Sequence, residues 1–374
     1  MIFPEAEDIF DISRKQGLTP DQILDFSADI NPLGLSKKAE KKLKTNLFAV
    51  LRYPDSHCLD LAKALAQFHD LSEDQILPGG GETAFIYAVP RVLSMPRVLV
   101  VTPTFREFEW ALETANQKGE CRIDFFETRE EDGFEVDAQG LISSLTNGYS
   151  ALYLSNPGFP TGILTGKEDL LRILAQTERQ KTWFILDERA IDFIEENSLK
   201  EMVNTCPRLI ILRSLAKFFA LPGLQVGYTI ANRGVVNILR QHKDLWMVNA
   251  LAQIAAIEAL NDKAYIRRTK EWLPKERNRL IQSLRSIPGF VPYPGTANYL
   301  LIQLLPFLGF TAGELREKLI PQGILICDCG PFHHLGPYFL QIAVRTHKEN
   351  NLLIKALRQI VQNLPPSGET SATS

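Results

Sequence analysis

Short, almost uninterrupted apolar runs recur through the middle of this 374-residue chain and constrain its fold more than any other feature. Four of these runs occupy residues 98–101, 151–154, 183–186 and 209–212. They lack the alternation of polar and apolar residues that marks a strand with one solvent-exposed face. Strands of this kind are buried on both faces, as in a mostly parallel sheet covered by helices. Helical patterns at 83–93 and 167–180 and a fifth run at 227–230 complete the α/β prediction.

The pattern changes after about residue 270. A long helical pattern at 265–286 is followed by strand patterns near 298–303, 324 and 339–344 and by helical patterns at 311–319 and 349–363. The chain is also too long for one simple core. We therefore expect a large α/β domain over 51–270, a small α+β domain formed by 1–50 with 271–364, and a flexible tail at 365–374.

Composition excludes several classes of protein. The net charge is −3 and the pI is about 6.1, so no basic excess favours nucleic acid. No run of 18 apolar residues predicts a membrane span, and the acidic start predicts no signal peptide. Five dispersed cysteines predict no disulfide framework and favour a cytoplasmic location.

Polar residues follow three of the apolar runs at the point where each predicted strand ends: Asn156, Asp187 and Ser214. Ligands of open α/β sheets bind at the carboxyl ends of the strands, so one site is expected there. Lys217 lies just beyond Ser214 among apolar neighbours. Desolvation would favour its neutral amine, a nucleophile for Schiff-base chemistry. The alternative is a lysine that extends from the core edge into water.

The other candidates each have a plain structural alternative. Asp187 fits a partner for a buried cation, or a helix cap or Mg²⁺ ligand. The glycines before Glu82 fit a phosphate cradle at a helix start, or a turn. Arg345 fits a bidentate clamp for a substrate carboxylate, or a surface ion pair. The cysteines and histidines of 327–334 lack the usual spacing of a structural zinc site, so we expect no metal there.

Taken together, these strings resemble the threonine-phosphate decarboxylases and histidinol-phosphate aminotransferases of the class I/II aminotransferase superfamily. The matching stretches lie in family order along nearly the whole chain. They are 25–34, 52–55, 81–83, 186–188, 212–215, 217–218, 222–224 and 343–345. The resemblance implies a fold-type I enzyme dependent on pyridoxal 5′-phosphate (PLP), with a mostly parallel sheet between helices and a small α+β domain.

The resemblance also implies roles for single residues. Lys217 matches the lysine that holds PLP, Asp187 the partner of the ring nitrogen, and Phe105 the aromatic residue that stacks on the ring. Gly81, Glu82, Thr83 and Ser214 match the groups around the cofactor phosphate. Tyr53 matches a tyrosine that reaches the cofactor of the other subunit, which implies a homodimer. Arg345, Asp29 and Tyr53 match substrate-binding positions, and the substrate implied is a small amino acid or amino-acid phosphate.

Several residues in these cofactor- and substrate-binding regions depart from the family pattern. Phe159 and Gln225 stand where the family has an asparagine and an arginine on the cofactor, and Ala216 stands where it has threonine or serine. Arg189 replaces the usual alanine after Asp-Glu, and Cys327 replaces an arginine. Asp29 replaces an asparagine, and the expected His-Gly-Gly gives way to residues 4–7.

Two classes of function follow. The first is a PLP-dependent decarboxylase resembling the threonine-phosphate enzymes of cobalamin biosynthesis, or an aminotransferase of the histidinol-phosphate type. The second is a degenerate, non-catalytic homologue with weak or absent PLP binding, motivated by the cluster of departures. Loss of a charge-assisted hydrogen bond, as at Gln225, costs roughly tenfold to a hundredfold in affinity.

Overall fold

The computed structural model of the chain describes residues 9–115 and 121–364. Its contacts divide the chain into two units. The large unit comprises Ile30–Phe159 and Ile163–Trp272, and the small unit comprises the chain up to Asp29, Pro160–Gly162 and the chain from Leu273. The division differs from the sequence expectation at 30–50, which packs in the large unit. The tail expected at 365–374 and the departure at residues 4–7 lie outside the described residues.

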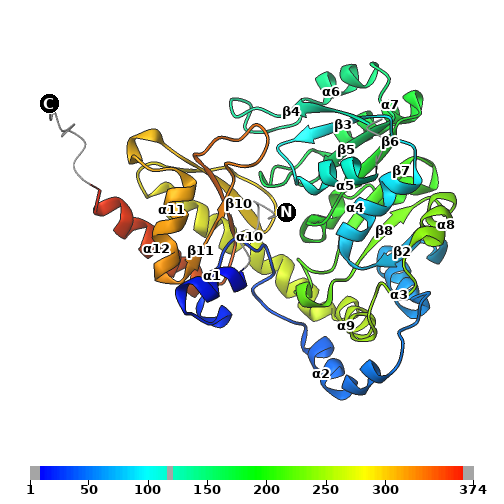
Figure 1. The fold of residues 1–374 in the computed structure, drawn as a ribbon, viewed down its shortest axis with the longest axis horizontal. Coiled ribbons are helices and arrows are strands. Elements are labelled where there is room, and N and C mark those ends of the chain that lie inside the picture. The colour runs from blue at the N-terminus through cyan, green and yellow to red at the C-terminus, as the bar shows by residue number, and fades with distance from the viewer. Residues whose placement is uncertain (1–8, 116–120, 365–374) are drawn as a thin grey trace. The chain divides into compact units, whose positions relative to one another are not determined.

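A seven-stranded sheet forms the centre of the large unit (Figure 1). Its order is β2 (Ile76–Gly79), β8 (Gly227–Ala231), β7 (Leu209–Ser214), β6 (Trp183–Asp187), β5 (Ala151–Ser155), β3 (Arg97–Thr102) and β4 (Arg122–Glu127). Only β8 pairs antiparallel with its neighbours within this sheet. The five predicted strands are confirmed, and the four continuous apolar runs are the parallel strands β3, β5, β6 and β7.

Helices pack on the sheet because both of its faces are apolar. Alternate residues of the strands, among them Val100, Tyr153 and Ile185, form one buried core with α4 and α5. The residues between them are also buried, and α7 covers β6. The helices of this unit are α2 (Lys37–Thr45), α3 (Leu59–His69), α4 (Gly81–Val92), α5 (Glu107–Ala115), α6 (Ala138–Leu145), α7 (Lys167–Gln180), α8 (Arg233–His242) and α9 (Ala250–Leu260).

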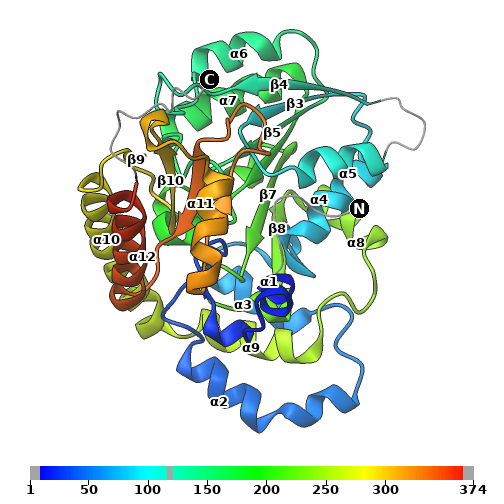
Figure 2. The ribbon, with the colours of Figure 1, turned by 60° about the vertical axis from the view of Figure 1, so that its left-hand side comes forward.

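The small unit has its own antiparallel sheet, seen with α11 and α12 in Figure 2. The order is β12 (Cys327–Asp328), β13 (Phe339–Ala343), β10 (Tyr299–Leu304) and β9 (Phe290–Pro292). A parallel pair joins β1 (Leu24–Asp25) to β11 (Ile324–Leu325). The helices are α1 (Ile9–Gln16), α11 (Ala312–Leu319) and α12 (His347–Gln362), and α10 (Lys263–Arg285) runs from the large unit into the small one.

These elements confirm the α+β pattern expected after residue 270. The capping boxes of Thr311 with Glu314 and of Thr346 with Glu349 fix where α11 and α12 begin. Among the described residues, no helix combines the length and apolar character that crossing a membrane requires.

Candidate functional site

Polar side chains gather at the carboxyl edge of the large sheet, on the face that packs against α4. Side chains two residues apart along a strand point to the same face. Ser155 and Asp187 therefore continue the rows of Tyr153 and Ile185, whose side chains lie in the core beneath α4. Ser155 and Asp187 are also direct neighbours in the register of β5 and β6. The sequence expectation that Asp187 lies at this edge thus agrees with the strand bounds.

Asp187 is almost fully buried and is paired with Arg189. The Nε atom of Arg189 donates to Oδ2 of Asp187 at 2.6 Å, and the backbone N–H of Arg189 donates to Oδ1 at 3.1 Å. The hydroxyl of Ser155 also donates to Oδ2, at 3.3 Å, and lies 3.1 Å from that of Thr104. Arg189 itself is only 4% exposed. Both carboxylate oxygens of Asp187 are therefore engaged within the large unit.

Phe105 lies under the guanidinium of Arg189. The Cζ atom of Arg189 is 4.3 Å from the centroid of the Phe105 ring and 5.8 Å from that of Phe159. The two phenyl rings meet edge to face at 5.8 Å. Arginine stacks well on aromatic faces because its charge is delocalised over a plane. The aromatic residue predicted to stack on a cofactor ring thus stacks on a side chain of its own chain.

Two further carboxylates share this buried region with Arg189. Desolvation raises the pKa of Asp187; the charge of Arg189 opposes this shift, and the charge of Glu82 adds to it. Desolvation likewise raises the pKa of Glu107, again against the charge of Arg189. The buried Oε2 atom of Glu107 has no hydrogen-bond partner among the described residues. The charge of Arg189 thus acts on both Asp187 and Glu107.

The predicted phosphate cradle is the start of α4 next to the β7–β8 connection. Gly81 has a φ of +82°, and a Cβ atom there would lie 3.4 Å from Oε1 of Gln225. A Cβ atom on Gly227 would lie 2.5 Å from the backbone N of Glu82. Only glycine lets β8 approach the helix start this closely. Ser214 ends β7 nearby and accepts a hydrogen bond from the backbone N–H of Ala216 at 3.2 Å.

Lys217 follows β7 by three residues and is half-buried. Its carbonyl oxygen accepts a hydrogen bond from the backbone N–H of Asn31 at 3.0 Å. The side chain of Asn31 is buried and donates to the carbonyl oxygen of Phe218 at 2.8 Å. These bonds hold the backbone around Lys217 at the carboxyl edge, where the sequence predicts the lysine.

Tyr53 lies on an exposed apolar surface of the large unit. Its side chain is 81% exposed and stacks on Trp246 with 4.6 Å between the ring centroids. We call this surface the apolar patch. Its residues, each more than half exposed, are Leu47, Phe48, Val50, Leu51, Tyr53, Leu59, Leu245 and Trp246.

Asp29 and Arg345 belong to the small unit. Asp29 is buried, and its carbonyl oxygen accepts a hydrogen bond from Nδ2 of Asn298 at 2.6 Å. Arg345 pairs with Glu349 at 2.7 Å and donates to the carbonyl oxygen of Asp25 at 2.9 Å. Its Nε is buried without a hydrogen-bond partner in the part of the chain that the structure describes.

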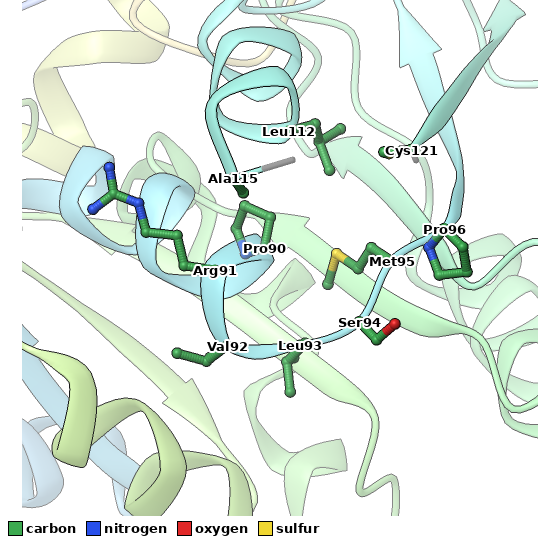
Figure 3. A pocket seen from close by; sticks show the side chains of 10 residues that line it. All are labelled: Pro90, Arg91, Val92, Leu93, Ser94, Met95, Pro96, Leu112, Ala115 and Cys121. Carbon is green, nitrogen blue, oxygen red and sulfur yellow. The ribbon is translucent and has the colours of Figure 1, made fainter. Parts of the chain in front are cut away.

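No group of three metal-ligating side chains occurs within 9–115 and 121–364, and Cys327 and Cys329 are buried. A cavity of about 330 Å³ lies at the opposite edge of the sheet, before β3 (Figure 3). Arg91 and Cys121 are its ionisable lining residues, and desolvation raises the pKa of the Cys121 thiol. A protonated thiol is a poor nucleophile, so we place no chemistry there.

Sequence reasoning missed three members of the site. Ser155 lies two residues after Tyr153 in a buried strand, and this spacing places it on the same face as Tyr153 at the end of the strand. Glu107 is the first residue of α5, and no sequence pattern marks it as a residue of the site. Arg189 is a visible departure, but the sequence does not show which way its side chain points.

Known proteins share this architecture. The family profile for class I and II aminotransferases matches residues 21–357. A threonine-phosphate decarboxylase of Salmonella typhimurium is 36% identical over 353 residues, which are 94% of each chain. The histidinol-phosphate aminotransferase of Clostridium acetobutylicum superposes with a TM-score of 0.83 at 28% identity, over 91% of this chain and 100% of that one. A histidinol-phosphate aminotransferase of Sinorhizobium meliloti in complex with PLP superposes with a TM-score of 0.84 at 20% identity, over 98% of this chain and 96% of that one.

The fold is therefore that of the fold-type I, PLP-dependent aminotransferases. The chain belongs to the class I and II aminotransferase family, as its sequence resemblance predicted.

The side chains at the edge of the large sheet fit PLP in kind. They include a lysine, a buried acid, an aromatic ring and a helix that begins at a glycine. The N-terminus of α4 suits a phosphate because its first backbone N–H groups have no partner within the helix. One feature disagrees, because Arg189 already occupies both the buried acid and the aromatic face.

Proposed function

We propose that this protein is a PLP-dependent enzyme acting on an amino acid or amino-acid phosphate, with threonine-phosphate decarboxylase as the model. The observation that carries the proposal is the joint presence of Lys217 and Asp187 at one edge of the large sheet in a member of this family. The 36% identity to a threonine-phosphate decarboxylase over 94% of both chains supports the substrate class. An aminotransferase of the histidinol-phosphate type is the alternative.

Each residue would have a distinct task. Lys217 would hold the cofactor through its amine, and the start of α4 with Thr83 and Ser214 would bind the phosphate. Asp187 would keep a proton on the ring nitrogen, and Phe105 would orient the ring. When bound, PLP supplies an electron sink for a carbon atom that has lost CO₂ or a proton.

On the substrate side we propose Arg345 as the carboxylate clamp. Its guanidinium, held by Glu349 and by the carbonyl oxygen of Asp25, is a planar donor group of the kind that binds a carboxylate. Asp29 and Tyr53 remain proposed contacts of the substrate. The charge of Asp29 disfavours a phosphate beside it, so a substrate without phosphate is compatible with this site.

We propose a homodimer as the assembled form. The apolar patch includes five exposed apolar or aromatic side chains within 47–53, and Trp246 stacks on Tyr53. Large contiguous apolar surfaces on soluble chains mark interaction sites. A second copy of this chain is the partner that the family resemblance implies, and a cytoplasmic location stays a prediction from cysteine usage.

A second candidate function is a non-catalytic homologue that folds without cofactor. The specific observation in its favour is the buried pair of Asp187 and Arg189, which satisfies the acid without PLP.

A trapping experiment separates these two candidates. The protein is saturated with PLP, reduced with borohydride and weighed by mass spectrometry. We expect the mass of one reduced pyridoxyl phosphate on Lys217 of the wild type and none on Lys217→Ala. Release of CO₂ from O-phosphothreonine then tests the substrate. Failure of the wild type to be trapped at any PLP concentration would favour the non-catalytic homologue.

A further inference from the structure

Arg189 makes the contacts that a cofactor ring would need. We propose that Arg189 is an internal competitor of PLP, which occupies the place of the pyridinium ring and must leave before the cofactor binds. This inference rests on the proposed function and adds a determinant of cofactor affinity to it.

The hydrogen bonds of Asp187 carry the first step of the argument. Oδ2 accepts from Nε of Arg189 and from the Ser155 hydroxyl, while Oδ1 accepts from the Arg189 backbone. The backbone bond and the serine bond can persist when a ligand is present. The Arg189 side chain supplies the positive charge, and a protonated ring nitrogen would supply the same charge at the same oxygen. The two cations are therefore alternatives.

The stack on Phe105 carries the second step. A guanidinium 4.3 Å from the ring centroid lies at the distance of a stacked planar group. A cofactor ring stacked on this face of Phe105 would need the same space. The side chain that holds the acid therefore also covers the aromatic face, so one rotation of Arg189 would open both.

Glu107 offers Arg189 a second carboxylate partner. Its buried Oε2 has no hydrogen-bond partner among the described residues, and Arg189 is near enough to affect its titration. A charge displaced from Asp187 would be costly to bury without a new partner. We infer that Arg189 turns toward Glu107 when PLP takes its place.

The test measures PLP affinity directly, by quenching of intrinsic fluorescence during titration. Arg189→Ala restores the residue that the family resemblance gives this position and should bind PLP at least tenfold more tightly than the wild type. Arg172→Ala removes an exposed arginine of α7 that pairs with Asp169, and it serves as the matched control with unchanged affinity.

Glu107→Gln supplies a second, independent measurement. It should weaken PLP binding severalfold in the wild-type background and have no effect beside Arg189→Ala, because the two side chains would act as one unit. Equal PLP affinity of the wild type and Arg189→Ala would overturn the inference and leave the proposed function intact. Absence of binding to both proteins would overturn the inference and the proposed function together.

Discussion

Gln225 is a single side chain that we expect to influence cofactor affinity. It stands where the family resemblance expects an arginine, and its Oε1 atom lies beside Gly81 at the helix start. A neutral amide offers a phosphate one modest hydrogen bond, whereas an arginine offers a charge-assisted fork. The position therefore links the sequence departure directly to the proposed phosphate site.

The reverse substitution is expected to restore affinity. Gln225→Arg should tighten PLP binding by roughly tenfold to a hundredfold, since a hydrogen bond to a charged group is worth about 1.5–3 kcal/mol. Equilibrium titration with PLP measures the effect, and inorganic phosphate should compete more strongly in the variant. An unchanged affinity would show that position 225 does not face the phosphate.

Residues at strand ends were accessible to prediction, and the directions of long side chains were not. Asp187 and Ser214 could be placed because a buried strand ends at each of them. Arg189 lies two residues beyond Asp187 in a turn, where the backbone no longer dictates a direction. Its contact with Phe105 joins segments more than 80 positions apart, which only the folded chain brings together.

At the scale of elements, a buried cluster of charged side chains joins α3 to β7. Arg213 is fully buried and pairs with Glu195 at 2.6 Å and Glu188 at 3.7 Å. His69, at the end of α3, lies 3.3 Å from Glu195 and 2.6 Å from the hydroxyl of Tyr228. Removing one partner from such a cluster leaves a buried charge uncompensated, so these elements are held together as a group.

Within this cluster, His69 makes a contribution to the pH dependence of stability whose sign follows from its lowered pKa. Desolvation lowers the pKa of His69 from 6.5 to about 4, against the hydrogen bond that its ring donates to Glu195. The unfolded chain therefore binds the proton more readily, and stability is complete above pH 6.5 and falls as the pH drops toward 4. His69→Gln keeps a polar group toward Tyr228 but cannot titrate.

We expect the denaturant midpoint of the wild type to fall more steeply than that of His69→Gln between pH 6.5 and 4. The difference in unfolding free energy is at most roughly 3 kcal/mol. Asp192, whose pKa burial raises to about 7, acts in the opposite direction but is present in both proteins. Parallel curves for the two proteins would show that His69 is already protonated in the fold.

Elements were predictable where periodicity was strong. The parallel strands β3, β5, β6 and β7 follow from apolar runs, and α7 follows from a 3.6-residue repeat. The edge strand β4 was missed because Arg122–Glu127 mixes charged and aromatic residues, as an edge with partial exposure requires. The short strands β1, β9 and β12 have two or three residues each, too few for a pattern.

At the scale of the whole molecule, the apolar patch is the feature that a single copy leaves exposed. Phe48 and Leu51 are 82% and 77% exposed. If a second copy covers them, Phe48→Glu with Leu51→Glu should convert a dimer into a monomer, because two charges would be buried at the interface. Sedimentation velocity measures the outcome. Phe307→Glu, at another exposed phenyl group, is the control and should remain dimeric.

The division into units was predictable only in outline. The change of pattern near residue 270 agrees with the boundary after Trp272. The segment 30–50 packs in the large unit because α2 lies against α9. This contact joins segments that are far apart in the sequence, so no local sequence pattern predicts it. The same reason explains why Pro160–Gly162 groups with the small unit, where the Gly162 carbonyl accepts from Thr296.

The pairing of Arg189 with Asp187 has a consequence for the newly made chain. Without Arg189, the buried carboxylate of Asp187 would lack this counterion until a cofactor ring bound beside it. Here the polypeptide carries its own counterion, so Asp187 is paired in the folded chain without a cofactor. A cell deprived of vitamin B6 would therefore still accumulate the folded protein.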